Sequence, residues 1–211
     1  MLSRFEPLFL QKMKDVCLAH PDPSHDLLHV KRVVRLARML GEQEGADLEV
    51  VVPAAYLHDC VYISKSDPRR SQASRISAQE AVRYLREIAY PETKLEAIAH
   101  AVEAHSFSAN IPARTLEARV VQDADRLDAI GAIGVARVFG VSGLMKRAFY
   151  HESDPFCENR QPDDYANTLD HFYVKLLKLP SMLTTTAGRA EGERRIGFMQ
   201  EYVRQLGSEI V

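Results

Sequence analysis

Two adjacent side chains that can bind metal, His58 and Asp59, follow directly on an apolar run from Val50 to Leu57. A run of that composition is expected to be buried, and buried polar groups need partners. His29 lies upstream of this pair and Asp125 lies downstream, each on a different segment. Imidazole nitrogen and carboxylate oxygen are the ligands that Mn, Fe, Co, Ni and Zn take at hydrolytic sites. The pattern therefore predicts one divalent-cation site assembled from three segments.

The spacing of these residues restricts how they can meet. Consecutive residues on a helix diverge by about 100°, so His58 and Asp59 reach one ion only if the end of their helix points at it. The polar stretch that begins at Ser64 fits such a helix end. His25 and His29 are four residues apart and share a helix face. Because His25 falls in the expected N-cap region, we predict that His29 is the ligand and His25 its neighbour.

Further carboxylates and imidazoles flank the predicted ligands. Asp125 and Asp128 are three residues apart and share a helix face, whereas Asp123 points elsewhere and is expected to be structural. His105 ends a predicted helix just before a loop, and we expect it to support the ligands or to contact phosphate. We interpret His100 as structural, and likewise the histidines that have no partner spacing, namely His20, His151 and His171.

Helical periodicity runs through most of the chain. Gly41 is predicted to end one helix, and Pro53 either kinks the next helix or marks its first turn. Polar loops are expected at 64–70 and 106–112, with an excursion at 153–163. The predicted helices cover 27–40, 48–61, 71–88, 91–105, 113–128, 129–139, 165–179 and 190–206. We find no internal repeat and no convincing run of strands, so the predicted fold class is all-α.

Bulk composition narrows the function classes. The 211 residues suit a single domain, with a core at about 20–140 and a C-terminal helical lobe at about 160–208. A net charge of −2 without a basic run argues against a stable nucleic-acid partner. The three cysteines lack CxxC spacing and are typical of free thiols in a reducing compartment. No signal segment or membrane-length apolar stretch is evident, so we predict a cytoplasmic protein with no membrane partner.

The motifs, taken in order, resemble the HD-domain superfamily of metal-dependent phosphohydrolases, which is named for this His-Asp pair. The likeness covers about 20–207, nearly the whole chain. Its segment DADRLDAIGAIG, from Asp123 to Gly134, is similar to a small bacterial branch that resembles nucleotide pyrophosphohydrolases. The other matching motifs are SHDxxH (Ser24 to His29), LHD (Leu57 to Asp59), HSFS (His105 to Ser108) and HFYVKLLKLP (His171 to Pro180).

The resemblance implies an HD-domain helical bundle with additional C-terminal helices. It also implies one divalent ion held by four side chains, namely His29, His58, Asp59 and Asp125. In the superfamily the last aspartate stands in an AD-x-L context, which selects Asp125. Members that bind two metals show an adjacent His-His pair that this chain lacks, so we expect one ion. We predict Mn²⁺, with Co, Ni, Mg, Fe or Zn as alternatives.

Such a site supports hydrolysis of a phosphate ester or anhydride, because the ion activates water and neutralises a phosphoryl oxygen. Phosphate charge that the ion leaves uncovered needs Lys or Arg. Lys65 and the pair Arg69-Arg70 are candidates because they follow the His-Asp pair within one loop. We expect catalysis to involve Asp59, Lys65, His105 and Asp128. We expect the substrate's phosphates to be contacted by Lys65, Arg69 and Lys175.

The predicted substrate is a small-molecule nucleotide, cleaved from a (deoxy)nucleoside triphosphate to the monophosphate and pyrophosphate. Alternatives are a phosphomonoesterase, a cyclic-nucleotide phosphodiesterase, and a non-catalytic helical module that binds metal and nucleotide. Neither a Ser-His-Asp arrangement nor a Gly-rich phosphate loop competes with the metal site. The spacing of residues along the sequence does not indicate whether the protein is a monomer or an oligomer. Candidate walls for base and sugar are Tyr56, Tyr62, Phe107, Phe149 and Tyr150.

Overall fold

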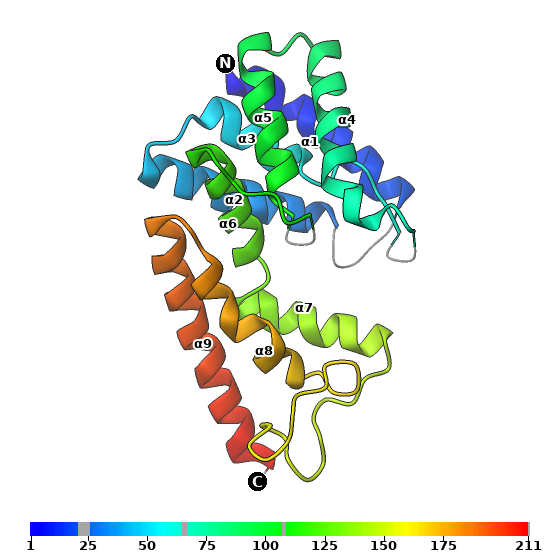
Figure 1. Cartoon of the computed structure of the whole chain (residues 1–211), viewed down its shortest axis with the longest axis vertical. Helices are drawn as coiled ribbons and strands as arrows, with labels where there is room; N and C mark the ends of the chain where they lie inside the picture. The colour runs from blue at the N-terminus through cyan, green and yellow to red at the C-terminus, as the bar shows by residue number, and fades with distance from the viewer. Residues whose placement is uncertain (21–25, 65–66, 107–108, 211) are drawn as a thin grey trace. The chain divides into compact units, whose positions relative to one another are not determined.

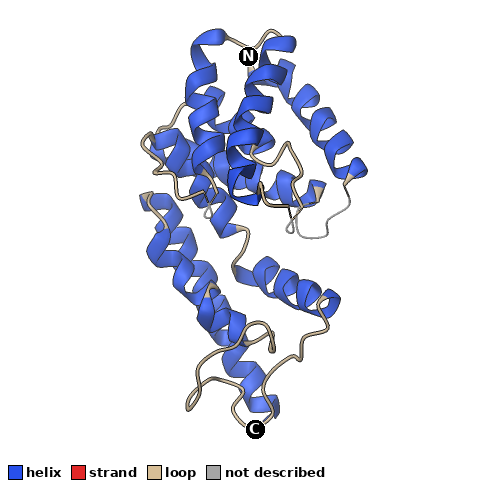
Figure 2. Ribbon diagram, turned by 45° about the vertical axis from the view of Figure 1, so that its right-hand side comes forward, coloured by secondary structure: helices blue, strands red, loops and turns tan. Residues whose placement is uncertain are grey.

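The computed structural model describes residues 1–20, 26–64, 67–106 and 109–210 (Figure 1). Within these ranges the chain is helical without a named strand, which confirms the predicted all-α class (Figure 2). The helices are α1 (Leu2–Ala19), α2 (Leu27–Glu44), α3 (Leu48–Leu57), η1 (Arg70–Gln72), α4 (Ala73–Glu87), α5 (Glu92–Ala104), α6 (Leu116–Leu127), α7 (Gly131–Leu144), α8 (Asp170–Val174), η2 (Leu176–Met182) and α9 (Thr186–Ile210).

The chain forms two compact units. The first consists of Met1–Asp125 together with Thr184–Ala187, and the second of Arg126–Leu183 together with Gly188–Val211. Helices α1 to α5 and most of α6 belong to the first unit. Helices α7, α8 and η2 and most of α9 belong to the second.

Helix α3 is the centre of the first unit. Every residue from Val50 to Leu57 is buried, and the helix contacts α1, α2, α4 and α5. A helix that is apolar on all sides has to be enclosed in this way. The Asp47 side chain caps its first turn by accepting a hydrogen bond from the Glu49 backbone N–H at 2.9 Å. Pro53 lies inside the helix, past the first turn, and α3 ends at Leu57 rather than at 61 as predicted.

The predicted helix end at Gly41 is wrong. Helix α2 continues to Glu44, and Gly45 caps it in the left-handed conformation with φ 73°. Gly41 itself is buried where α2 meets the next helix, and a Cβ placed there would lie 2.8 Å from Leu48 Cδ2. This glycine thus permits close packing of α2 against α3.

An N-terminal helix that we did not predict completes the first unit. Phe5, Phe9 and Met13 of α1 are buried and share one helix face. The Phe9 ring lies 5.7 Å from that of Tyr56, and the Phe5 ring lies 4.8 Å from that of Tyr90. Aromatic pairs at these separations contribute beyond the area they bury. They fix α1 against α3 and against the segment between α4 and α5.

The second unit has a core of its own, formed by Phe139, Phe172 and Tyr202, whose ring centroids lie 6.2–6.4 Å apart. The predicted helix at 165–179 is instead two short helices, α8 and η2, because the backbone leaves helical geometry at Lys175, with φ −133°. The buried carboxylate of Asp170 anchors the preceding loop, since it accepts hydrogen bonds from both terminal nitrogens of Arg160 at 2.5 and 2.7 Å.

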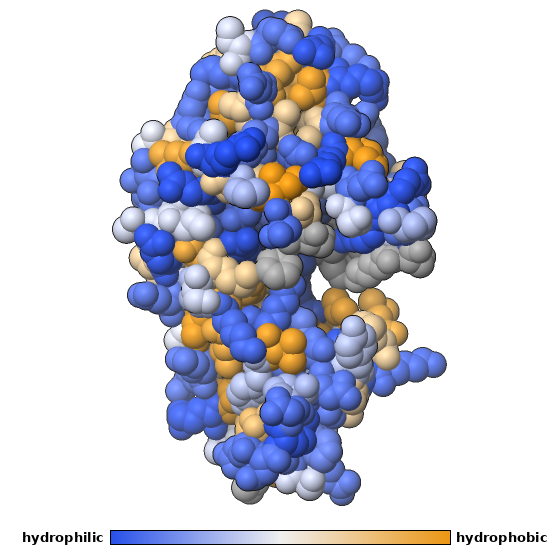
Figure 3. All heavy atoms as spheres, in the orientation of Figure 1, coloured by the Kyte–Doolittle hydropathy of each residue, from blue (hydrophilic) through white to orange (hydrophobic). Residues whose placement is uncertain are grey.

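On the face shown in Figure 3, hydrophilic residues predominate and hydrophobic ones form separate patches. No single helix among the described residues is long and apolar enough to cross a membrane; by length and composition alone, the bent pair of α6 and α7 passes the same test.

Candidate metal centre

The predicted ligands lie at or near the ends of three helices in the first unit. His58 follows the last residue of α3, and Asp125 lies in the last turn of α6. His29 lies in the first turn of α2, where its backbone N–H donates to the Asp26 side chain at 2.7 Å. The N-cap of α2 is therefore Asp26, whereas His25 lies outside the described residues.

Three of these side chains point their donor atoms at one another. His29 Nε2 lies 3.3 Å from His58 Nε2 and 3.5 Å from Asp125 Oδ1. His58 Nε2 lies 3.9 Å from the same carboxylate oxygen. Ligands of a single ion, each about 2.0–2.2 Å from it, have such mutual separations.

A second group shares one member with the first. The Asp59 carboxylate spans two imidazoles, with Oδ2 3.6 Å from His58 Nε2 and Oδ1 3.6 Å from His105 Nε2. The Nε2 atom of a neutral imidazole has one lone pair, so His58 can bind only one ion. The structure thus brings His105 to the four predicted ligands, with the centroid of its ring 4.9 Å from that of the His58 ring.

The imidazole contacts fit a cation in this place. His58 donates its Nδ1–H to the Ala55 carbonyl at 2.9 Å, and His105 donates its Nδ1–H to the Val102 carbonyl at 2.6 Å. These bonds leave the Nε2 lone pairs of both rings facing the carboxylates. His58 is fully buried and His105 is 5% exposed, so repulsion between lone pairs is poorly screened there. A divalent ion would remove that repulsion, and backbone carbonyls orient metal-binding histidines in this manner.

The charges of the side chains also suit metal binding. Burial lowers the pKa of His58, which keeps its imidazole neutral. Burial by itself would raise the pKa of Asp125, but the neighbouring His58, His29 and His105 hold it below its usual value. Burial would lower the pKa of His105, and the Asp59 carboxylate outweighs this and raises it. Neutral imidazole and ionised carboxylate are the forms that bind a metal, so the pKa shifts of His58 and Asp125 favour metal binding, whereas the raised pKa of His105 favours its protonated form.

Other predicted site residues are not among these grouped donors or lie outside the described chain. Lys65 lies outside the described residues. Arg69 is bound by the Asp67 carboxylate at 2.8 Å, and its side chain is 66% exposed. Two more belong to the second unit: Asp128 is buried and pairs with Arg137, and Lys175 is exposed between α8 and η2.

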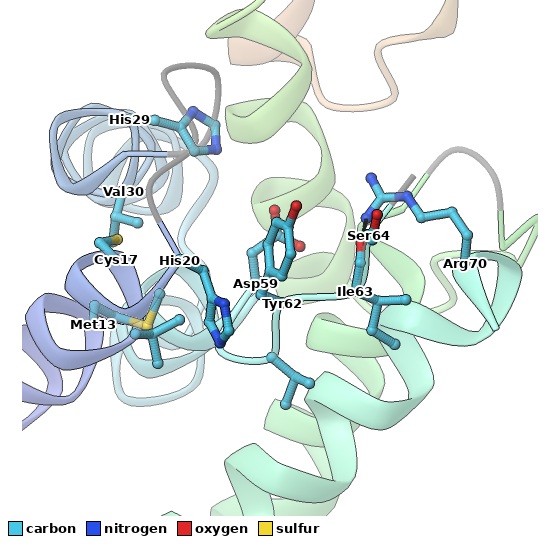
Figure 4. Close-up of a pocket in the computed structure, with 12 residues that line it drawn as sticks. Met13, Cys17, His20, His29, Val30, Asp59, Tyr62, Ile63, Ser64 and Arg70 are labelled. Atoms are coloured by element: carbon cyan, nitrogen blue, oxygen red, sulfur yellow. Dashed lines mark hydrogen bonds between the residues drawn. The ribbon is translucent and has the colours of Figure 1, made fainter. Parts of the chain in front are cut away.

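A cavity of about 270 Å³ adjoins the centre, and the predicted ligands His29 and Asp59 form part of its wall (Figure 4). Helix α1 supplies another part of the wall, including Cys17, and His20 follows it. His20, which we had interpreted as structural, stacks on Tyr62 with centroids 4.8 Å apart and an interplanar angle of 12°. An available signal for this wall was the four-residue repeat of Phe5, Phe9, Met13 and Cys17, which is typical of one helix face.

Of the candidate walls for base and sugar, Tyr62 lines this cavity. Tyr56 is buried against Phe9 in the core of the first unit. Phe107 lies outside the described residues, and Phe149 and Tyr150 belong to the second unit.

Comparisons with known proteins agree with this geometry. A family model for the HD domain matches residues 27–130. The uncharacterized protein YpgQ of Bacillus subtilis (strain 168) is 34% identical over 198 residues, which cover 92% of this chain and 88% of that protein. A crystal structure of an HD-superfamily hydrolase from Bacillus thuringiensis has a TM-score of 0.77 and 30% identity, covering 99% of this chain and 97% of its own. The crystal structure of Bacillus subtilis YpgQ in complex with ADP has a TM-score of 0.75 and 33% identity, covering 97% of each chain.

The HD-domain match and the similar HD-superfamily hydrolase identify the class of protein, a metal-dependent hydrolase. The chain belongs to the HD superfamily.

Proposed function

We propose that this protein is a divalent-metal-dependent nucleotide phosphohydrolase that cleaves a (deoxy)nucleoside triphosphate to the monophosphate and pyrophosphate. The observation that carries the proposal is the meeting of the four donors of His29, His58, Asp59 and Asp125 beside a cavity that two of them line. The similar YpgQ has been crystallised with ADP, which supports a nucleotide as the ligand.

In this proposal the four side chains hold one ion, for which we favour Mn²⁺. When bound, the ion supplies neutralisation of phosphate charge and activation of water. The chain's own residues prepare the place for it. The Ala55 carbonyl fixes the ring of His58, and the Asp59 carboxylate faces the Nε2 atoms of both His58 and His105, in contact with the cavity. Because both of these rings are buried, solvent has little access to that side of the centre.

The test is turnover by metal-stripped protein supplied in turn with Mn²⁺, Co²⁺, Ni²⁺, Mg²⁺ and Zn²⁺. A panel of ribo- and deoxyribonucleotides is offered, and phosphate and pyrophosphate are measured separately. We expect triphosphates to yield pyrophosphate and monophosphate in equal amounts, and His58→Ala to reduce turnover to background. The matched control is His100→Ala. His100, which lies on α5, accepts a hydrogen bond from the Arg114 backbone N–H at 3.0 Å and is not among the grouped donors, so turnover should persist.

Other outcomes would contradict the proposal. Phosphate released from monophosphates would indicate a phosphomonoesterase, and ring opening of a cyclic nucleotide a phosphodiesterase. Nucleotide binding without turnover under every metal would indicate a binding module. Circular dichroism of His58→Ala has to match the unaltered protein, so that lost activity reflects a lost ligand and not unfolding.

A further inference from the structure

The cavity beside the metal centre has two chemically different sides. Arg70 and Ser64 lie on one side, and Met13, Cys17 and Val30 lie on the opposite side (Figure 4). Asp59 and Tyr62 are between them in this view. A ligand that is charged at one end and apolar at the other fits such a cavity, with its middle at the metal centre.

Arg70 is the cation of the charged side. It opens η1, where its backbone N–H donates to the Asp67 carbonyl at 2.9 Å. Its guanidinium donates one hydrogen bond, to the Ile63 carbonyl at 3.1 Å. A guanidinium has five N–H donors, and no ion pair of Arg70 with a carboxylate occurs within the described ranges. Most of its donors are therefore available to a ligand in the cavity.

The adjacent Arg69 is in the opposite situation. Its Nε and Nη2 atoms both bind the Asp67 carboxylate, at 3.1 and 2.8 Å, and it is not part of the cavity wall. Two neighbouring arginines thus differ in what they can bind. The Ile63 carbonyl, four residues beyond Asp59, holds the Arg70 fork on the segment that carries the metal ligands. A fork held in this way suits the oxygen atoms of phosphate groups.

The apolar side offers a flat surface as well as volume. Next to it, His20 and Tyr62 stack nearly parallel (Figure 4), and Tyr62 is 46% exposed. Exposed aromatic rings bind planar nucleotide bases by stacking. The neighbouring Met13, Cys17 and Val30 extend the surface without adding charge.

Resting on the proposed function, we propose that Arg70 binds the pyrophosphate part of the substrate and that the His20–Tyr62 side binds the nucleoside. The bond to be cleaved then lies beside the metal ligands. Water oxygen bonds to the α-phosphorus while the bond to the α–β bridging oxygen breaks. Pyrophosphate leaves with the electron pair of that bond, and the proton of the water is released to solvent. Arg70 is thus a binding residue for the leaving group.

The test compares two probes by calorimetry on the full chain loaded with Mn²⁺. α,β-Methylene ATP carries all three phosphates but cannot be cleaved at the α–β position, and AMP lacks the two outer phosphates. Arg70→Ala should weaken binding of the methylene analogue about 10- to 100-fold, the value of charge-assisted hydrogen bonds, and leave AMP unchanged. Tyr62→Ala should weaken both probes about 10-fold through lost stacking. Arg69→Ala, the matched control, should change neither.

Three results would overturn the assignment. The first is that Arg70→Ala binds the methylene analogue as tightly as the unaltered protein does. The second is that Arg70→Ala loses as much affinity for AMP as for the analogue, which would mean that Arg70 only supports the cavity wall. The third is an equal effect of Arg69→Ala, which would indicate general surface charge. Each of these leaves the proposed function standing as long as the unaltered protein binds the analogue. If the unaltered protein binds neither probe, the proposed function fails, and this assignment fails with it.

Discussion

His105 is a buried imidazole that contacts both the Asp59 carboxylate and the ring of His58. Its Nε2 faces Asp59 Oδ1, and its Nδ1–H is held by the Val102 carbonyl. We predict that it positions the Asp59 carboxylate. Residues that orient metal ligands typically contribute about 10- to 100-fold to metal affinity. His105→Ala should therefore weaken Mn²⁺ binding by about that factor, as measured by competition with a fluorescent chelator.

The control for this variant is again His100→Ala, which should keep the affinity of the unaltered protein. Unchanged affinity in His105→Ala would mean that this imidazole only fills space. Loss of all measurable Mn²⁺ binding would instead mean that His105 is itself a metal ligand. Asp59 would then contact two metal-binding imidazoles.

At this scale the sequence predicts which residue types meet, but not which of two neighbours points inward. The His-Asp pair and its flanking His29 and Asp125 indicated the centre, and the resemblance to the HD superfamily implied the set of four donors; that they bind an ion stays a proposal. Arg69 and Arg70 could not be separated in this way. The Asp67 carboxylate binds the guanidinium of Arg69, two residues further along the chain. This ion pair becomes evident only in the structure, where Arg70 and not Arg69 lines the cavity.

Helix α7 shows how one helix can contain glycines of different kinds. A Cβ at Gly134 would lie 2.3 Å from the Ala129 carbonyl oxygen, which is backbone and cannot easily move. At Gly140, in the same helix, a Cβ would meet nothing within 4 Å. Gly134→Ala should lower the free energy of unfolding by about 1–3 kcal/mol, as overpacking does.

Gly140→Ala is the matched variant and should raise the free energy of unfolding by about 0.5–1 kcal/mol, because alanine restricts the unfolded chain and favours helix. Urea unfolding followed by circular dichroism measures both. Equal effects of the two substitutions would contradict the close approach at Gly134.

Elements were predicted best where one face had to be buried. Periodicity placed the helices of the first unit, from α2 to α6, within a few residues of their bounds. The errors have local causes. Gly41 was interpreted as a helix end although it serves a helix contact, and the backbone break at Lys175 has no glycine or proline of its own to signal it. The aromatic face of α1 was present in the sequence but was not used.

The candidate site belongs to one of the two units into which the chain divides. The donor groups and the walls of the cavity belong to the first unit, whereas the second unit is organised about its own aromatic core and the buried Asp170. Composition and length could not reveal this division, because α6 and α9 each continue from one unit into the other without a linker-like sequence. The stability of the second unit can therefore be tested without changing a donor of the centre.

The Asp170 carboxylate gives that test a pH dependence with a definite sign. Burial by itself would raise its pKa, but hydrogen bonds from Arg160 and from the Asp163 backbone N–H outweigh burial and lower it below the usual 3.8. A depressed pKa means that Asp170 stabilises the folded state above the pKa of the unfolded chain, and that this stability is lost as pH falls through the folded-state pKa.

Asp170→Asn should thus lower the free energy of unfolding by about 3 kcal/mol at pH 7, where it leaves Arg160 without its carboxylate. The difference between variant and unaltered protein should shrink as the pH falls below 3.8, because the unfolded chain is then protonated at Asp170 whereas the folded protein takes up this proton only at lower pH. Urea midpoints of both proteins, measured by circular dichroism from pH 7 down to pH 3, provide the comparison. A difference that stays constant across this range would show that the hydrogen-bond geometry of Asp170, and not its charge, holds the loop of the second unit in place.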